Sequence, residues 1–130
     1  MSLKLLKHLP TLTILSLLLS LPMGKSYAQQ LDSDQIKSAY IYNFIKHIEW
    51  PEEAAKDKYV LGIYQDAIFY EIISKSLHNK PIKNKVLSVI LIENIPQAID
   101  TDILFVSRKS TVDISTVASS LRQTNTLLIT

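Results

Sequence analysis

Side chains that could hold a metal or transfer a proton are sparse in this chain of 130 residues. His47 and Glu49, just before Trp50, have the His-x-Glu spacing of zinc deaminases. That zinc site also needs a pair of cysteines, and the sequence has none. Two positions apart on one helix, His47 and Glu49 would also fall on different faces. We therefore expect no metal site, and we interpret His47 as a partly exposed residue near a helix end.

The sequence also lacks the patterns of a catalytic nucleophile and of a phosphate-binding loop. No serine lies in the glycine-flanked turn of a nucleophile elbow, and two glycines, Gly24 and Gly62, are too few for a glycine-rich loop. We interpret the acidic residues around the first predicted helix as solvent-exposed surface: Asp32, Asp34, Glu49, Glu52, Glu53 and Asp57. We therefore predict that the protein is not an enzyme and carries no cofactor.

Two loops that follow predicted strands hold candidate ligand-binding residues. Gln65 and Asp66 follow a predicted strand over residues 59–64, and Ser107 and Arg108 follow another over residues 103–106. Ligands of open α/β sheets bind beyond the carboxyl ends of the strands, so these four residues would line such a crevice. Capped turns explain the same residues, and we favour that interpretation.

The first 28 residues have the three parts of a secretory signal peptide. Lys4 and Lys7 form a basic start, residues 9–21 form an apolar run, and Ser26-Tyr27-Ala28 supplies small residues for signal peptidase. The apolar run is short for a membrane span, and an uncleaved anchor is the alternative. We predict cleavage after Ala28, which leaves a mature domain of residues 29–130.

The mature chain has no basic surface. Removal of Lys4, Lys7 and Lys25 with the leader lowers the formal net charge from +2 to −1, because the leader contains no acidic residue. Nucleic acid is therefore not an expected partner. Without cysteine, the exported domain must be stabilised by its hydrophobic core rather than by disulfides.

Residues 29–33 are expected to form a short polar lead before the first helix. Asp32 and Gln35 fit a capping box that opens this helix, and Pro51 is expected to end it. Its apolar residues form two rows, which are Ile36, Tyr40, Phe44 and Ile48, and beside them Ile41 and Ile45. We expect Tyr40 and Phe44 to lie in the core. Trp50 is interpreted as buried beneath the helix end, with a partner-binding hot spot as the alternative.

The remaining elements alternate between strands and helices. Strands are predicted at residues 59–64, 86–92, 103–106 and from 127, with helices after Asp66 and over 114–121 and a single turn at Pro96. Strands that are apolar on both faces predict an α/β fold, in which helices cover a mostly parallel sheet and a helix comes first. Because the last strand runs to the end of the chain, we expect the domain to be incomplete at its C-terminus.

The stretch from Lys37 to Pro51 resembles the signature opening of the YfiR-like family. The matching residues are Lys37, Ala39, Tyr40, Tyr42, Asn43, Phe44, Glu49, Trp50 and Pro51. Residues 102–107 and 126–130 resemble two strand segments of the same family, so the likeness covers most of the mature chain.

The resemblance implies a periplasmic, non-catalytic α/β protein. The best-known members repress an inner-membrane diguanylate cyclase by binding its periplasmic sensor domain, and an outer-membrane lipoprotein sequesters the repressor. Members are typically homodimers. The motif residues Tyr40, Tyr42, Asn43, Phe44, Glu49, Trp50 and Pro51 are then candidate partner-binding residues. The alternative is a periplasmic ligand-binding component that works with a sensor kinase or a transport system, like other relatives.

The sequence departs from the family pattern in three places. The cysteines that form disulfides in characterised members are absent, so redox control does not carry over. Gln65 stands where the family usually has glycine before Asp66, which weakens a ligand site in that loop. The family's C-terminal turn, strand and helix do not appear after Thr130, so we expect any partner surface formed by them to be missing as well.

Overall fold

The structure is a computed structural model that describes residues 26–50 and 56–130, with side chains from Ser33 onward. Most of the predicted signal peptide and Pro51 of the family motif lie outside the described residues. Leu31–Thr130 forms a compact unit.

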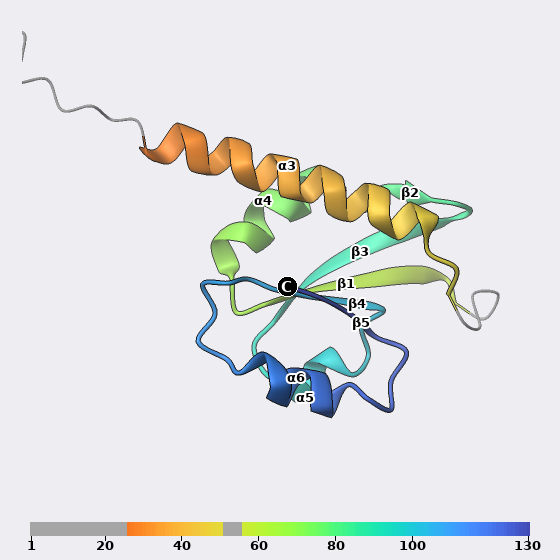
Figure 1. Cartoon of the computed structure of the whole chain (residues 1–130). Helices are drawn as coiled ribbons and strands as arrows, with labels where there is room; N and C mark the ends of the chain where they lie inside the picture. The colour runs from red at the N-terminus through yellow and green to blue at the C-terminus, as the bar shows by residue number, and fades with distance from the viewer. Residues whose placement is uncertain (1–25, 51–55) are drawn as a thin grey trace, which may run out of the picture. The chain divides into compact units, whose positions relative to one another are not determined.

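A five-stranded sheet organises this unit, with the strand order β2-β3-β1-β4-β5 (Figure 1). Strands β3, β1, β4 and β5 run parallel to their neighbours, and only the short β2 pairs antiparallel, with β3. The predicted α/β fold with a mostly parallel sheet and a helix first is therefore confirmed. The elements are α3 (Ser26–His47), β1 (Lys58–Tyr64), α4 (Ala67–Leu77), β2 (Pro81–Ile82), β3 (Lys85–Ile92), α5 (Ile95–Ala98), β4 (Ile103–Val106), α6 (Ile114–Ser120) and β5 (Leu127–Ile129).

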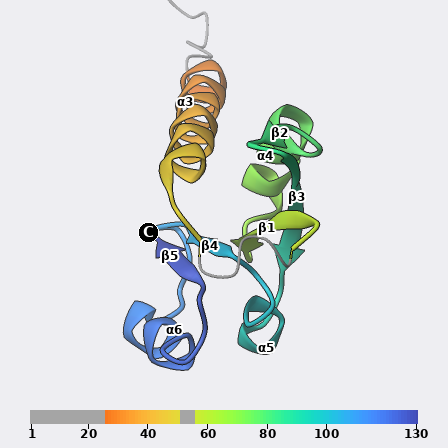
Figure 2. The ribbon, with the colours of Figure 1, turned by 90° about the vertical axis from the view of Figure 1, so that its right-hand side faces the viewer.

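The helices cover the two faces of the sheet in pairs. Helices α3 and α4 lie on one side and α5 and α6 on the other (Figure 2). Each side encloses its own hydrophobic cluster, one around Ile45, Leu61 and Ile73, and the other around Leu104 and Val117. The central strands are buried on both faces, as their continuous apolar sequences predict.

Helix α3 differs from the sequence prediction at its start. The helix already begins at Ser26, so the predicted polar lead over residues 29–33 and a cap at Asp32 are wrong. Residues 26–33 contain no proline or glycine that would interrupt a helix. Extending an existing helix adds a hydrogen bond for each further residue, so the helix continues through Asp32 although its side chain could have capped a helix start. The helix ends at His47, before Trp50 and Pro51, as expected.

The buried face of α3 also differs from the prediction. Ile41 and Ile45 are buried, whereas Ile36, Tyr40 and Phe44 are 50%, 72% and 51% exposed, so the expectation that Tyr40 and Phe44 lie in the core is wrong. The face that packs on the sheet continues through two buried polar residues, Asp34 and Ser38. Their burial is compensated, because the Ser38 hydroxyl donates to the backbone oxygen of Asp34 and the Asp34 carboxylate pairs with Lys37. Asp34 is therefore not the exposed acid that we expected.

Candidate functional site

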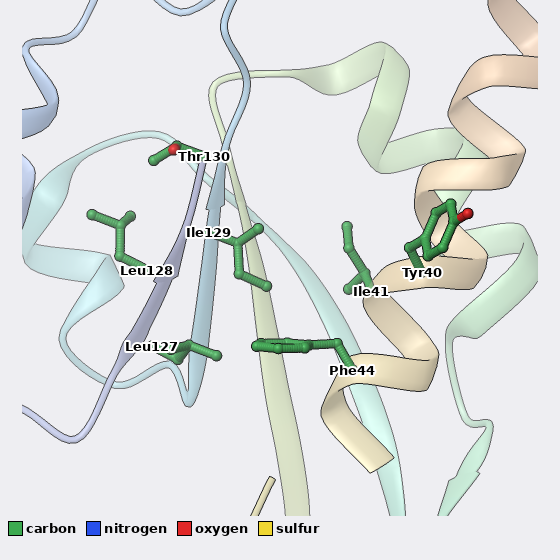
Figure 3. Close-up of a pocket in the computed structure, with 7 residues that line it drawn as sticks. All are labelled: Tyr40, Ile41, Phe44, Leu127, Leu128, Ile129 and Thr130. Atoms are coloured by element: carbon green, nitrogen blue, oxygen red, sulfur yellow. The ribbon is translucent and has the colours of Figure 1, made fainter. Parts of the chain in front are cut away.

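An apolar groove of about 440 Å³ lies between helix α3 and strand β5 (Figure 3). We call it the α3–β5 groove, and its lining residues are Tyr40, Ile41, Phe44, Leu127, Leu128, Ile129 and Thr130. Figure 3 shows Ile41 and Phe44 extending from the helix toward the side of β5 that carries Leu127 and Ile129, while Leu128 points to the other side. Apart from the Tyr40 and Thr130 hydroxyls, the lining side chains are hydrocarbon, so the groove is suited to apolar contact rather than to chemistry.

Strand β5 forms one edge of the described sheet. Among the described strands only β4 pairs with it, through the register Ile103↔Leu127 to Phe105↔Ile129. An edge strand presents backbone N–H and C=O groups that can pair with a further strand. The groove therefore combines an apolar helix face with a strand edge.

The exposed apolar row of α3 borders this groove. Ile36, Tyr40 and Phe44 follow each other at intervals of four residues and lie on one side of the helix. Two of these three, Tyr40 and Phe44, are motif residues. Contiguous exposed apolar surface in a folded protein often marks an interaction site. This surface can therefore contact a segment of another protein.

Tyr42 and Asn43, the next motif residues, do not line the groove. The Tyr42 hydroxyl donates to the backbone oxygen of Pro81 over 2.8 Å, and the ammonium groups of Lys46 and Lys80 lie 5.5 and 5.1 Å from its ring centre. Lys46 belongs to α3 itself, so the contacts with Pro81 and Lys80 are those that attach the helix to the β2–β3 hairpin. Asn43 is exposed on the helix surface.

Trp50 is buried, with only 8% of its surface exposed, and its ring centre lies 6.0 Å from that of Tyr59. The interpretation of Trp50 as a residue packed beneath the helix end is confirmed, and an exposed hot spot at this position is not. Its indole Nε1 is buried without a hydrogen-bond partner among the described residues. Glu49 beside it is exposed.

The two candidate ligand loops have different surroundings. Ser107 and Arg108 line a second cavity of about 250 Å³, together with Lys37, Phe105, Lys109 and Thr130. Gln65 and Asp66 do not line it. Asp66 instead caps α4 by accepting from the backbone N–H of Phe69 over 3.0 Å, and Gln65 donates to the backbone oxygen of Glu93. The capped-turn interpretation is therefore confirmed for Asp66.

The described ranges of the chain are residues 26–50 and 56–130. Within these ranges no group of three or more potential ligands could hold a metal ion. No described helix is long and apolar enough to cross a membrane. His47 is the exposed last residue of α3.

Two features of the site were missed by the sequence reasoning. Leu127 to Ile129 were recognised as a strand but not as a wall of the groove, because no local signal reveals which strand forms the sheet edge. The sequence identifies Lys37 only as a motif residue. Its place beside the loop at Ser107 depends on how the chain folds and has no local signal in the sequence.

The sequence profile of the YfiR/HmsC-like family matches residues 34–130, which is most of the chain. Among curated proteins and among solved structures, none matches the chain. The match begins at Asp34 in α3 and includes the groove, the second cavity and all motif residues described above.

Proposed function

The chain belongs to the YfiR/HmsC-like family, and from this premise we propose that it is a non-catalytic periplasmic regulator of a membrane-anchored signalling protein. The family is one of periplasmic regulators of diguanylate cyclases. We propose that this protein binds and restrains such a cyclase and thereby lowers cyclic di-GMP. The proposed partners are the cyclase's periplasmic domain, an outer-membrane lipoprotein that competes for the regulator, and a second copy of this chain.

The observation that carries this proposal is the exposure of Tyr40 and Phe44 beside the α3–β5 groove. Aromatic residues contribute much of the binding energy at protein interfaces, because they bury large rigid surfaces at a low cost in side-chain entropy. A partner that covers these two rings gains that energy. We propose the periplasmic domain of the cyclase as this partner, with an apolar segment of it in the groove.

Restraint by contact requires that the regulator distinguish two states of the cyclase. A protein that binds both states equally shifts nothing, however tightly it binds. The regulator must therefore bind the inactive arrangement of the periplasmic domain more tightly than the active one. No catalytic group is needed for this mode of action.

The function is tested first in cells. Deletion of the gene is expected to raise cyclic di-GMP, and restoration of the gene is expected to lower it again. Crosslinking in the periplasm should recover a diguanylate cyclase together with the protein. Unchanged cyclic di-GMP in both strains, with no cyclase recovered, would refute this proposal.

The contact surface is tested with Tyr40→Ser, which removes an exposed ring. We expect this variant to release the cyclase, while its free energy of unfolding stays within about 0.5 kcal/mol of the original, as for other surface substitutions. Ile68 on α4 is the matched control, because it is 74% exposed and does not line the groove. If Ile68→Ser releases the cyclase equally, the groove is not the contact surface.

A second candidate function is a ligand-binding sensory component that works with a sensor kinase or a transport system. The cavity at Ser107 and Arg108 favours it, because three cationic side chains line one small cavity. Thermal unfolding against a panel of metabolites tests this candidate, since a ligand of the folded state raises the unfolding temperature by mass action.

A further inference from the structure

The second cavity, which we call the Lys37–Arg108 cavity, lies beyond the carboxyl ends of two adjacent parallel strands. Ser107, Arg108 and Lys109 directly follow β4, and Thr130 directly follows β5. Ligands of open α/β sheets bind at this edge. Lys37 reaches the cavity from α3, so the lining side chains come from separate parts of the chain.

The charge of the lining is strongly positive. Lys37, Arg108 and Lys109 each carry a positive charge. The Asp34 carboxylate lies 2.8 Å from the Lys37 ammonium group and pairs with that cation, whereas Arg108 and Lys109 form no ion pair with a described residue. Two cations without an ion pair suit a dianion.

The remaining lining groups indicate the chemistry of that dianion. The backbone N–H of Lys109 donates to the Ser107 hydroxyl oxygen over 3.3 Å, which leaves the hydroxyl hydrogen able to donate to a ligand. The guanidinium fork of Arg108 matches a carboxylate with two parallel hydrogen bonds. Phe105 adds an apolar wall, which its packing on Phe69, with ring centres 4.8 Å apart, holds in place.

Size limits the ligand further. A cavity of about 250 Å³ is smaller than the roughly 300–1,000 Å³ typical of drug-sized ligands, which favours a small metabolite. Because the cations come from two elements and share the cavity with an aromatic ring, two anionic groups joined by a short hydrocarbon chain fit better than a compact phosphate. We propose that the Lys37–Arg108 cavity binds a short-chain dicarboxylate.

This inference rests on the second of the two proposed functions, ligand sensing, and does not depend on cyclase binding. The test uses the protein purified from the periplasmic fraction, with succinate and glutarate as probes. Succinamide, the uncharged analogue of succinate, and inorganic phosphate serve as comparisons, all at the same ionic strength. We expect succinate or glutarate to raise the unfolding temperature and to give a measurable heat of binding, and succinamide to do neither.

The variants assign the binding to the cavity. Arg108→Gln and Lys109→Gln are each expected to weaken dicarboxylate binding at least tenfold. Arg122→Gln is the matched control, since Arg122 is an exposed arginine outside the cavity lining. Equal losses in the control would show that the effect is nonspecific screening and would overturn the proposal.

Three further outcomes would overturn the inference. If neither dicarboxylate binds, the cavity is not a dicarboxylate site. If phosphate binds more tightly than succinate does, the proposed ligand class is wrong. Stabilisation by an uncharged metabolite, unaffected by Arg108→Gln, would keep ligand sensing but place it elsewhere. Cyclic di-GMP in the deletion strain is measured separately, so failure here and failure of the cyclase proposal are distinguishable.

Discussion

The hydroxyl of Tyr42 donates a hydrogen bond to the backbone oxygen of Pro81 over 2.8 Å and thereby joins helix α3 to strand β2 across 39 positions of the sequence. The Lys83 ammonium group adds a second connection, to the backbone oxygen of Ile48 over 3.1 Å. Tyr40 lies two residues from Tyr42, which is about 200° around the helix. Fixing Tyr42 to the hairpin therefore directs Tyr40 to the opposite side, where the exposed apolar row lies.

Removal of the Tyr42 hydroxyl tests this connection. Tyr42→Phe is expected to lower the free energy of unfolding by about 0.5–1 kcal/mol, toward the low end for a hydrogen bond because solvent reaches this one. Urea denaturation measures the change. Tyr40→Phe is the control, because Tyr40 is exposed and makes no hydrogen bond to another described side chain or backbone group. Equal effects of the two substitutions would show that the Tyr42–Pro81 bond contributes nothing.

Truncation of Trp50 should act through stability. Because Trp50 is buried against Tyr59, Trp50→Ala is expected to cost about 3–5 kcal/mol, as large aromatic truncations in cores do. That is a large share of the stability of a small domain, so regulation would be lost through unfolding. Trp50→Phe should cost much less, since it keeps a ring and removes the unpaired indole N–H. Normal stability of the alanine variant, with regulation lost, would instead indicate a direct contact.

The elements that were predicted correctly are those with local determinants. Strand β3 is a long β-branched run, and Asp66 caps α4 through a bond to the N–H of Phe69 only three residues away. Strand β2 was missed because it has two residues and is bounded by Asn79 and Lys83 at positive φ. Lysine is not a residue that signals such a turn.

The face of α3 could not be predicted locally. Its sequence offers two apolar rows, and the aromatic side chains of Tyr40 and Phe44 favoured the wrong one. The choice depends on contacts with distant residues, among them Pro81, and on the satisfied hydrogen bonds that allow Asp34 and Ser38 to be buried. The site was predictable only in part for the same reason, because the family motif identified Tyr40 and Phe44 but not the strand beside them.

Gly62 in the central strand β1 allows close packing with its neighbours. A Cβ atom there would lie 2.7 Å from Cγ1 of Ile92, 3.0 Å from Cγ2 of Thr101 and 3.2 Å from Cδ1 of Leu104. Gly62→Ala is therefore expected to lower the free energy of unfolding by about 1–3 kcal/mol through overpacking. In an Ile92→Ala background, which lacks Cγ1, the same substitution should cost less, because the nearest of these contacts is then absent. A Gly62→Ala variant as stable as the original would show that Ile92, Thr101 and Leu104 can move apart without cost.

The Asp113 carboxylate is the N-cap of helix α6, and its hydrogen bonds make the stability of the protein depend on pH. It accepts from the Ser115 hydroxyl over 2.6 Å, from the Ser115 backbone N–H over 3.0 Å and from the Thr116 hydroxyl over 3.1 Å. These bonds, with the Ser115 hydroxyl contributing most, hold the pKa of Asp113 below its usual value of 3.8.

A pKa that is lower in the folded than in the unfolded state makes folding favour the charged carboxylate. The stabilisation by Asp113 is then fully present above about pH 3.8 and is lost as the pH falls through the folded-state pKa. NMR titration of the Asp113 carboxyl carbon should give a midpoint below 3.8, and Ser115→Ala should raise that midpoint toward 3.8 because it removes the strongest contribution. A midpoint at or above 3.8 in the original protein, or one that Ser115→Ala leaves unchanged, would contradict this account of the cap.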